Sequence, residues 1–192
     1  MYFYADTDSN QPIVIGNNTF TNNSAQSGNG GVMFIYATNA NQSIAMGNNT
    51  FTNNSAQAGT VGGVMFITAL NTSQPIAIGN NTFTNNSAPL SGGVMYIVAG
   101  SDTNQPIAIG NNTFTNNSAQ SGGILYTKTT NTAMYITLEE AIISGSMNNA
   151  TDIVMLDSSN EGTIKLMNIH LIEPSPDHFI GNMTTKSVQF EG

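Results

Sequence analysis

The sequence predicts an all-β protein folded as a parallel β-helix, a solenoid with coils of about 31 residues. A ten-residue motif, Gly-Asn-Asn-Thr-Phe-Thr-Asn-Asn-Ser-Ala, occurs four times without a change. Its phenylalanines, spaced by 31 or 32 residues, are Phe20, Phe51, Phe83 and Phe114. A fixed period in this range is typical of a solenoid. Residues 1–132 have no sustained 3.6-residue apolar period, which excludes the helical TPR, HEAT and ankyrin repeats.

Each repeat contains two short apolar segments that we expect to form strands. They are rich in β-branched and aromatic residues and are bounded by Gly, Pro, Asn and Ser. The first segment occurs at 13–15, 44–46, 76–78 and 107–109. The second follows a glycine pair and occurs at 32–35, 64–67, 94–97 and 124–126. Parallel stacking of the repeats would place identical positions about 4.8 Å apart.

Period-two alternation predicts which side chains point into the β-helix. Ile13 and Ile15 should point inward and Val14 outward, as should their equivalents in later coils. The four phenylalanines should form one inward column, with Thr19, Thr21 and their equivalents outside. The asparagine three residues after each phenylalanine should turn inward at a corner and join a hydrogen-bonded ladder, besides forming a turn. These asparagines are Asn23, Asn54, Asn86 and Asn117.

The repeat resembles that of the chlamydial polymorphic membrane proteins and their relatives. The shared pattern is Phe-x-x-Asn, here residues 20–23, followed by Gly-Gly and an apolar pair, here residues 30–33, with three further copies. The resemblance covers roughly residues 1–127 and implies a right-handed parallel β-helix that is displayed on a cell surface and used in adhesion. The chain departs from the family in having Val or Ile where Ala is usual after Gly-Gly, and no C-terminal autotransporter barrel lies in these residues. These departures leave the anchoring and the source organism open.

We divide the chain into regular β-helix repeats at 1–127, starting in mid-coil, and divergent β-helical coils with a capping tail at 128–192. Residues 1–5 align with residues 33–37, so the first residue falls inside a strand, and no signal peptide precedes it. We expect this open strand edge to pair with another copy or with upstream sequence. Further strands are predicted at 133–136, 153–156, 163–166 and 169–171, and one short helical turn at 138–142.

Titratable side chains are nearly absent from the repeats, which argues against an enzyme. Asp102 is the only Asp, Glu, Lys or Arg between Ser9 and Thr127, whereas general acid–base catalysis and glycoside hydrolysis need such groups. Residues 6–10 place oxygen ligands at alternate positions but lack the glycine and the closing glutamate of a calcium loop. His170 and His178 are isolated and the chain has no cysteine. We therefore predict no metal site and no cofactor.

Composition also limits the partners. The net charge is −8 and the chain has only three basic residues, all lysines, which argues against nucleic acid. No apolar segment has the length of a membrane-spanning helix. Solubility must come from uncharged polar side chains or from attached sugar.

Asn-x-Ser/Thr sequons occur twice in each repeat and at four other positions. One interpretation is that an Asn-rich turn produces sequons by composition and that repetition multiplies them. The other is a dense coat of N-linked glycans on a secreted protein. Equivalent sites in stacked coils would lie about 5 Å apart, which limits how many can be occupied. The candidate sites are Asn17, Asn22, Asn41, Asn48, Asn53, Asn71, Asn80, Asn85, Asn111, Asn116, Asn149 and Asn182.

The strand after each glycine pair is apolar on both of its alternating faces. We expect Met33 and Ile35 on one face and Val32 and Phe34 on the other. A strand of this kind is normally buried on both faces, yet the outer wall of a β-helix faces water. Either residues 37–42 and their equivalents fold over this outer stripe, or a second chain or a sugar docks on it. The predicted interaction stripe is Phe34, Phe66, Tyr96 and Tyr126.

These observations lead to three functional hypotheses. The first is an extracellular structural or adhesive β-helix of a cell-surface protein or fibre, which self-associates end to end or laterally and contacts a host surface or glycan. The second is an ice-binding solenoid that uses Thr19, Thr21 and their equivalents as outward columns. The third is a carbohydrate-active enzyme. A glycan on Asn17 or Asn48 would obstruct the threonine face, so sequon occupancy distinguishes the first hypothesis from the second.

Overall fold

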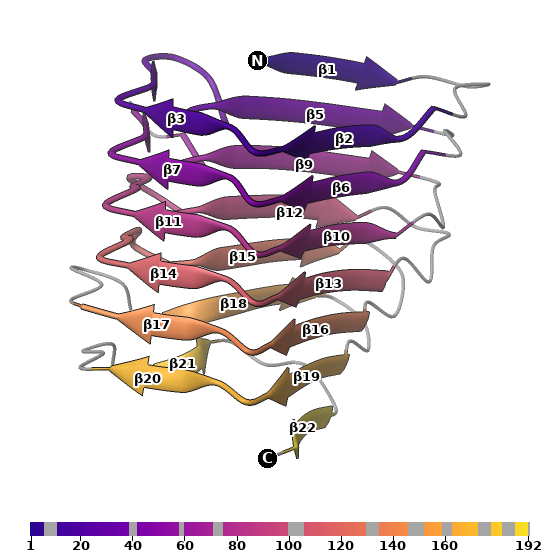
Figure 1. The fold of residues 1–192 in the computed structure, drawn as a ribbon, viewed down its shortest axis with the longest axis vertical. Helices are drawn as coiled ribbons and strands as arrows, with labels where there is room; N and C mark the ends of the chain where they lie inside the picture. The colour runs from indigo at the N-terminus through magenta and orange to yellow at the C-terminus, as the bar shows by residue number, and fades with distance from the viewer. Residues whose placement is uncertain are drawn as a thin grey trace.

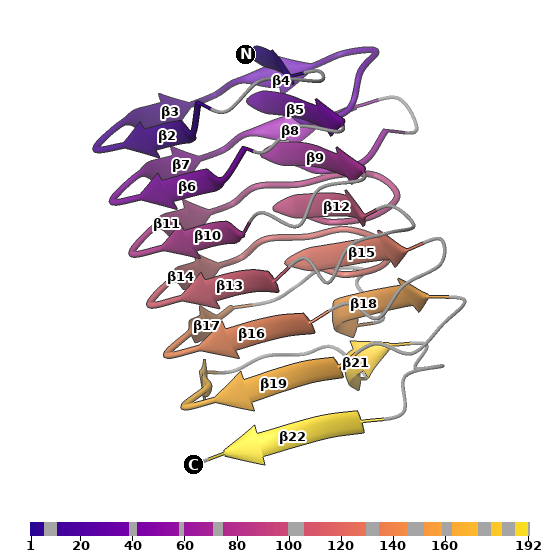
Figure 2. The same ribbon diagram turned by 90° about the vertical axis from the view of Figure 1, so that its right-hand side faces the viewer.

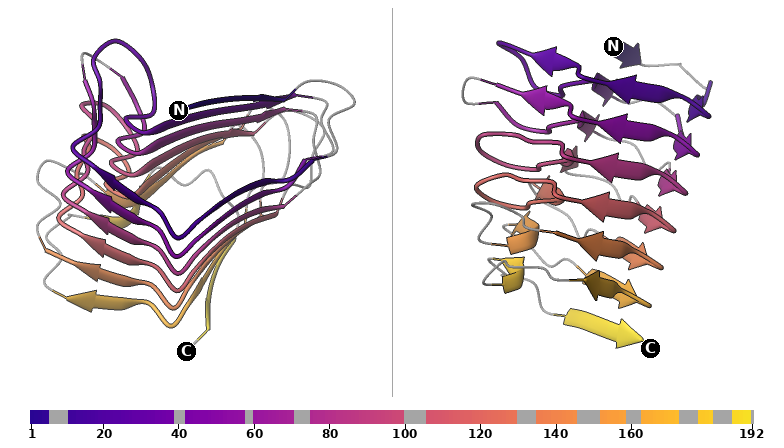
Figure 3. Two further views of the ribbon diagram at one scale, coloured as in Figure 1. Left: turned by 45° about the horizontal axis from the view of Figure 1, so that its top comes forward. Right: turned by 60° about the vertical axis from the view of Figure 1, so that its left-hand side comes forward.

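The chain winds as a right-handed parallel β-helix, with its coils stacked along one long axis (Figure 1). The computed structural model describes residues 1–5, 11–38, 42–57, 60–70, 75–99, 106–129, 135–145, 152–158, 163–172, 178–181 and 187–191. These residues contain strands, turns and bends and no helix. Each coil has three sides, and the sides of successive coils lie above one another (Figures 2 and 3).

Three parallel sheets form the three sides of the stack. Sheet 1 contains β1 (Tyr2–Ala5), β5 (Met33–Thr38), β9 (Met65–Leu70), β12 (Met95–Ala99), β15 (Leu125–Thr129), β18 (Asp152–Ser158) and β21 (His178–Gly181). Sheet 2 contains β2 (Ile13–Gly16), β6 (Ile44–Gly47), β10 (Ile76–Gly79), β13 (Pro106–Gly110), β16 (Tyr135–Glu139), β19 (Thr163–Met167) and β22 (Ser187–Glu191). Sheet 3 contains β3 (Thr19–Thr21), β7 (Thr50–Thr52), β11 (Thr82–Thr84), β14 (Thr113–Thr115), β17 (Ile142–Ser144) and β20 (His170–Ile172). A short pairing joins β4 (Ser24–Ala25) to β8 (Ser55–Ala56).

The strands pair in the register that the repeat predicts. In sheet 2, Ile76 lies opposite Ile107 and Ala77 opposite Ala108. Ile76 and Ile78 are buried whereas Ala77 between them is exposed, as period-two alternation requires. In the first coil Val14 points outward and is 70% exposed. The predicted assignment of inward and outward positions in this strand is confirmed.

The predicted phenylalanine column lies in the core. Phe51, Phe83 and Phe114 are completely buried, and Phe20 is partly buried against the same core. Neighbouring rings lie 4.9–5.1 Å apart between centroids, with planes within 8° of parallel. Stacked coils impose this face-to-face arrangement, because identical side chains repeat at the spacing of the strands.

The predicted asparagine ladder runs beside the phenylalanine column. Nδ2 of Asn54 donates to Oδ1 of Asn86 at 3.0 Å, and Nδ2 of Asn86 donates to Oδ1 of Asn117 at 3.0 Å. Each of these amides also satisfies a backbone carbonyl, as Asn86 does by donating to the oxygen of Phe51 at 3.0 Å. Asn54, Asn86 and Asn117 are fully buried. The ladder therefore replaces the water that a buried amide would otherwise need.

A second ladder, which the sequence interpretation missed, lies at the other corner of sheet 3. Nδ2 of Asn49 donates to Oδ1 of Asn81 at 3.0 Å, and Nδ2 of Asn81 donates to Oδ1 of Asn112 at 3.1 Å. These three side chains are 1–2% exposed. The signal was present in the sequence, because the motif contains two Asn-Asn pairs and not one. In both pairs the second asparagine turns inward.

The first asparagine of each pair forms the corner itself. All eight such residues in the four repeats have positive φ angles of 52–59°, a left-handed conformation that Asn adopts more readily than most residues. Glu140 and Asn168 have φ angles of 47° and 51° at the equivalent corner of the next two coils. The Asn-Asn dipeptide thus combines a tight corner with a buried ladder.

The glycine pair forms the corner that enters sheet 1. Gly62 has a φ of 72°, and a Cβ there would clash with the carbonyl oxygen of Met65. A Cβ on Gly63 would clash with the carbonyl oxygens of Gly93 and Ser87 in the next coil. No larger residue fits either position, which explains why the pair recurs.

The prediction that Val32 lies on the outer face with Phe34 is wrong. Val32 is 5% exposed, and its equivalents Val64 and Val94 are completely buried. The chain bends at Val32 before β5 begins, and the amides of Val32 and Met33 both donate to the carbonyl oxygen of Val64, at 2.9 and 3.0 Å. Two consecutive residues therefore point inward, as in a β-bulge.

The divergent C-terminal residues continue the same three sheets. β16, β19 and β22 extend sheet 2, and β17 and β20 extend sheet 3. The helical turn predicted at 138–142 is wrong, because Glu140 and Ala141 occupy the corner between β16 and β17. Ala141 is completely buried at the coil position of the second ladder, and Ile143 continues the column of Phe114. Ala141 has no amide to continue the second ladder, so that ladder ends at Asn112.

Candidate functional site

The predicted interaction stripe is a continuous column of stacked rings on the outer face of sheet 1. Phe34 and Phe66 stack with centroids 4.9 Å apart, Phe66 and Tyr96 with centroids 5.4 Å apart, and Tyr96 and Tyr126 with centroids 4.8 Å apart. Tyr2 extends the column by one ring, at 5.0 Å from Phe34. We call these five residues the aromatic column: Tyr2, Phe34, Phe66, Tyr96 and Tyr126.

The aromatic column lies on the outer surface of sheet 1, and its rings cover one another's faces. Phe34 lies between the buried residues Met33 and Ile35, so its side chain points away from the core. The four rings from Phe34 to Tyr126 are only partly buried, and Tyr2 is 66% exposed. Adjacent planes differ by 5–19°. The ring faces therefore contact each other, and the ring edges are what the column presents to solvent.

Polar groups border the column at its end near β18. The hydroxyl of Tyr126 donates to Oδ2 of Asp157 at 2.8 Å. Burial, this hydrogen bond and the negative charge of Asp157 all raise the pKa of Tyr126 above its ordinary value. Burial and the charge of Asp157 raise the pKa of Tyr96 in the same direction. Both phenols are thus held in the neutral form that can donate a hydrogen bond.

A second column follows the aromatic column two residues further along each strand. Tyr4 and Tyr36 stack at 5.4 Å with nearly parallel planes, and Thr68, Val98 and Lys128 continue this column in register. The segment at 37–42 is one of the two structures that the sequence predicts to cover the interaction stripe. Residues 39–41 of this segment lie outside the described part of the chain, so that prediction stays untested.

The outer face of sheet 3 carries the predicted threonine columns. On β7, Thr50 is exposed, Phe51 is buried and Thr52 is partly exposed, and β11 repeats this pattern. The exposed corner asparagines border this face on both sides. The face therefore presents uncharged hydrogen-bonding side chains at every outward position of the four repeats.

Eight of the twelve candidate glycosylation sites lie at the corners of the repeats, and all eight are exposed. They are Asn17, Asn22, Asn48, Asn53, Asn80, Asn85, Asn111 and Asn116. The other four lie outside the described residues: Asn41, Asn71, Asn149 and Asn182. These corner asparagines are exposed, and the ladders use only the second asparagine of each pair.

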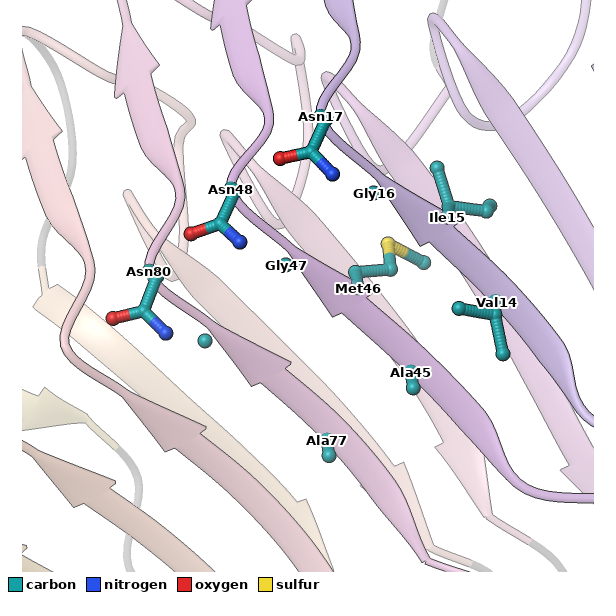
Figure 4. A pocket seen from close by; sticks show the side chains of 11 residues that line it. Val14, Ile15, Gly16, Asn17, Ala45, Met46, Gly47, Asn48, Ala77 and Asn80 are labelled. Atoms are coloured by element: carbon teal, nitrogen blue, oxygen red, sulfur yellow. The ribbon is translucent and has the colours of Figure 1, made fainter.

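A shallow trough of about 410 Å³ runs across the coils where sheet 2 meets the first asparagine corner. In Figure 4 the amides of Asn17, Asn48 and Asn80 stand in a row beside it, and Ala45 and Ala77 lie on its opposite side. Gly16, Gly47 and Gly79 leave its floor without side chains. The sequence interpretation did not predict this trough, although a glycine ends the same strand in all four repeats.

In the part of the chain that the structure describes, no three His, Asp or Glu residues are arranged to hold a metal ion. Asp152 is buried and accepts a hydrogen bond from the amide of Gly122, which gives it a structural role at the end of the glycine corners. Residues 6–10 and Asp102 lie outside the described residues. Among the described residues no helix has the length and hydrophobicity to cross a membrane.

Comparison of the chain with models of protein families, with curated proteins and with solved structures finds no match.

Proposed function

We propose that this chain is an extracellular structural or adhesive β-helix segment of a cell-surface protein or fibre, and not an enzyme. The aromatic column carries the proposal, because partly exposed aromatic side chains that are continuous over several coils are typical of an interaction surface. The outer face of sheet 3 is uncharged, and residues 9–127 contain almost no charged side chains. Both features favour a protein that binds a partner through its surface over one with a catalytic site.

The resemblance of the Phe-x-x-Asn and Gly-Gly repeat to the chlamydial polymorphic membrane proteins supports the same assignment. N-linked glycans at the exposed corner asparagines belong to the proposal, since they would add polarity to a surface that has little charge. Self-association is its third part. Laterally, the aromatic column would contribute to the contact; end to end, the outermost strands of the sheets would pair with those of another copy.

The test is to replace two rings of the aromatic column and measure assembly and adhesion. In the Phe34→Ser and Phe66→Ser double variant, we expect sedimentation to show weaker assembly, or binding to cell-coated surfaces to fall roughly tenfold. The fold should be retained, because neither side chain belongs to the buried core. The matched control is Thr50→Ser with Thr82→Ser on sheet 3. Normal assembly and adhesion in the phenylalanine variant would make the column internal packing and refute the proposal.

Ice binding is the second candidate, and the outward threonine columns favour it. Thr19, Thr50 and Thr82 are exposed in register on a parallel sheet, so their hydroxyls repeat at about 4.8 Å along the stack. Thr50→Lys with Thr82→Lys should abolish inhibition of ice growth if this is the function. If the unglycosylated chain leaves ice growth unchanged, this candidate is eliminated.

A further inference from the structure

The aromatic column presents ring edges outward, and this geometry selects its ligand. The faces of Phe34, Phe66 and Tyr96 are covered by the rings above and below, at centroid distances of 4.8–5.4 Å. A sugar ring binds to aromatic side chains by lying on an open face, and the inner rings of the column offer none. The edge of an aromatic ring carries the positive part of its quadrupole, and the face of another ring carries the negative part. Ring edges therefore bind the faces of other aromatic systems.

From this geometry we infer that the outer face of sheet 1 binds elongated planar aromatic molecules, which lie along the stack with their faces against the ring edges. The inference rests on the proposed role of the aromatic column as a binding surface and specifies the chemical class of its ligand. Five rings in register span four coil steps, a length of roughly 20 Å. That length fits several fused or linked aromatic rings.

The column is too narrow to hold a second copy of the chain by itself, and its width favours a slender ligand. A stable protein–protein interface buries about 800 Å² on each partner, whereas the column is one side chain wide. The neighbouring column begins with Tyr4 and Tyr36, about 7 Å away on the same face. A planar molecule lying along the stack contacts both columns.

The negative charge of Asp157 and of the whole chain favours a neutral or cationic ligand over an anionic one. Asp157 follows Lys128 in the neighbouring column, because the two residues are paired in register. Its carboxylate accepts the hydrogen bond of Tyr126, the last ring of the aromatic column. The chain as a whole carries a net charge of −8. Long-range attraction therefore favours cations.

Thioflavin T, a cationic elongated aromatic dye, is the probe. We expect saturable binding to the unglycosylated full chain, read by fluorescence titration. Phe66→Leu keeps an apolar side chain but removes the central ring, and it should weaken binding by roughly tenfold. Phe66→Tyr restores a ring, as at Tyr96, and should bind within about twofold of the original chain. Thr50→Ser on sheet 3 is the control for a distant face.

Two outcomes overturn the inference: no saturable binding, or equal binding by the Phe66→Leu and Phe66→Tyr variants. Circular dichroism and thermal unfolding check that each variant folds, and Phe34→Leu with Phe34→Tyr repeats the comparison one coil away. The same variants distinguish failure of the inference from failure of the proposed function. If dye binding requires the ring but adhesion and assembly survive Phe34→Ser with Phe66→Ser, only the adhesive role is refuted. If adhesion falls in that double variant but the dye does not distinguish Leu from Tyr, only the ligand class is lost.

Discussion

The side-chain amide of Asn54 donates to Oδ1 of Asn86, one coil further along the stack, at a distance of 3.0 Å. The backbone amide of Asn54 donates to the same oxygen at 2.9 Å. One buried asparagine side chain thus fixes both the backbone and the side chain of its neighbour.

Replacing Asn86 with Ala should destabilise the fold strongly. The change leaves the two Asn54 donors and the carbonyl oxygen of Phe51 without their partner in the interior. We expect the free energy of unfolding to fall by about 3–5 kcal/mol, because each unsatisfied buried group costs about 1–3 kcal/mol. Asn85→Gly is the matched control, since Gly tolerates the positive φ of this exposed corner. Chemical denaturation measures both, and equal losses would contradict the ladder argument.

Phe83→Ala should cost about 3–5 kcal/mol of unfolding free energy, because it opens a cavity in a completely buried site. Phe83 stacks on Phe51 and on Phe114. Phe20→Ala should cost clearly less, since Phe20 is only partly buried and stacks on one ring in the described residues. Thermal and chemical unfolding of the two variants give the comparison. A loss at Phe20 as large as that at Phe83 would argue against a core column that ends in the first coil.

Stability should fall in strongly alkaline solution. The pKa of Tyr126 is raised in the folded chain from its ordinary value of 10.0. A raised pKa means that the stabilisation is complete below pH 10 and is lost as the pH rises above it toward the folded-state value. Tyr126→Phe should flatten this part of the pH profile. Phenolate absorbance lost in the Tyr126→Phe variant should report Tyr126 ionising above the ordinary value of 10.0, and ionisation at or below that value would contradict the prediction.

Expression in a eukaryotic secretory host should attach glycans to the exposed corner asparagines, in alternate coils. Equivalent sites lie about 4.8 Å apart, which is too close for bulky glycans on adjacent coils of one molecule. Intact mass and peptide mapping should therefore find at most two occupied sites in the column that contains Asn17, Asn48, Asn80 and Asn111. Complete absence of glycans would remove them from the proposed function.

An added repeat should extend the stack without unfolding it. Inserting a second copy of residues 79–109 before Gly110 places one complete coil between two matching coils. Each coil contacts mainly its neighbours, so the extra interface should leave the chain at least as stable. Small-angle scattering should report a longest dimension greater by about 5 Å. An insoluble product, or one that melts at a lower temperature, would show that the coils are not interchangeable.

The sequence was sufficient to predict the fold, the register and the phenylalanine column, because identical motifs at a fixed spacing can only stack in register. One asparagine ladder was also predictable from the three-residue distance to phenylalanine. The ladder at Asn49 was not predicted, because Asn49 precedes Phe51 and the three-residue distance applies only to the asparagine that follows the phenylalanine. The inward turn of Val32 escaped period-two reasoning, since a bulge breaks the alternation. The edge-on rings of the aromatic column follow from coil stacking and not from residue type.

The asparagine ladders give the stack a direction. In every side-chain bond between ladder asparagines, Nδ2 of one coil donates to Oδ1 of the next coil. The Oδ1 acceptors of the first coil are therefore left over: within the described residues, no donor reaches Oδ1 of Asn18 or Asn23. Two such ends brought face to face would oppose oxygen to oxygen and repel. A coil added above Asn18 and Asn23 must bring amide N–H groups, as another asparagine-bearing repeat does. The buried amides thus act as a one-way template, in which each coil specifies the chemistry of the coil that can precede it.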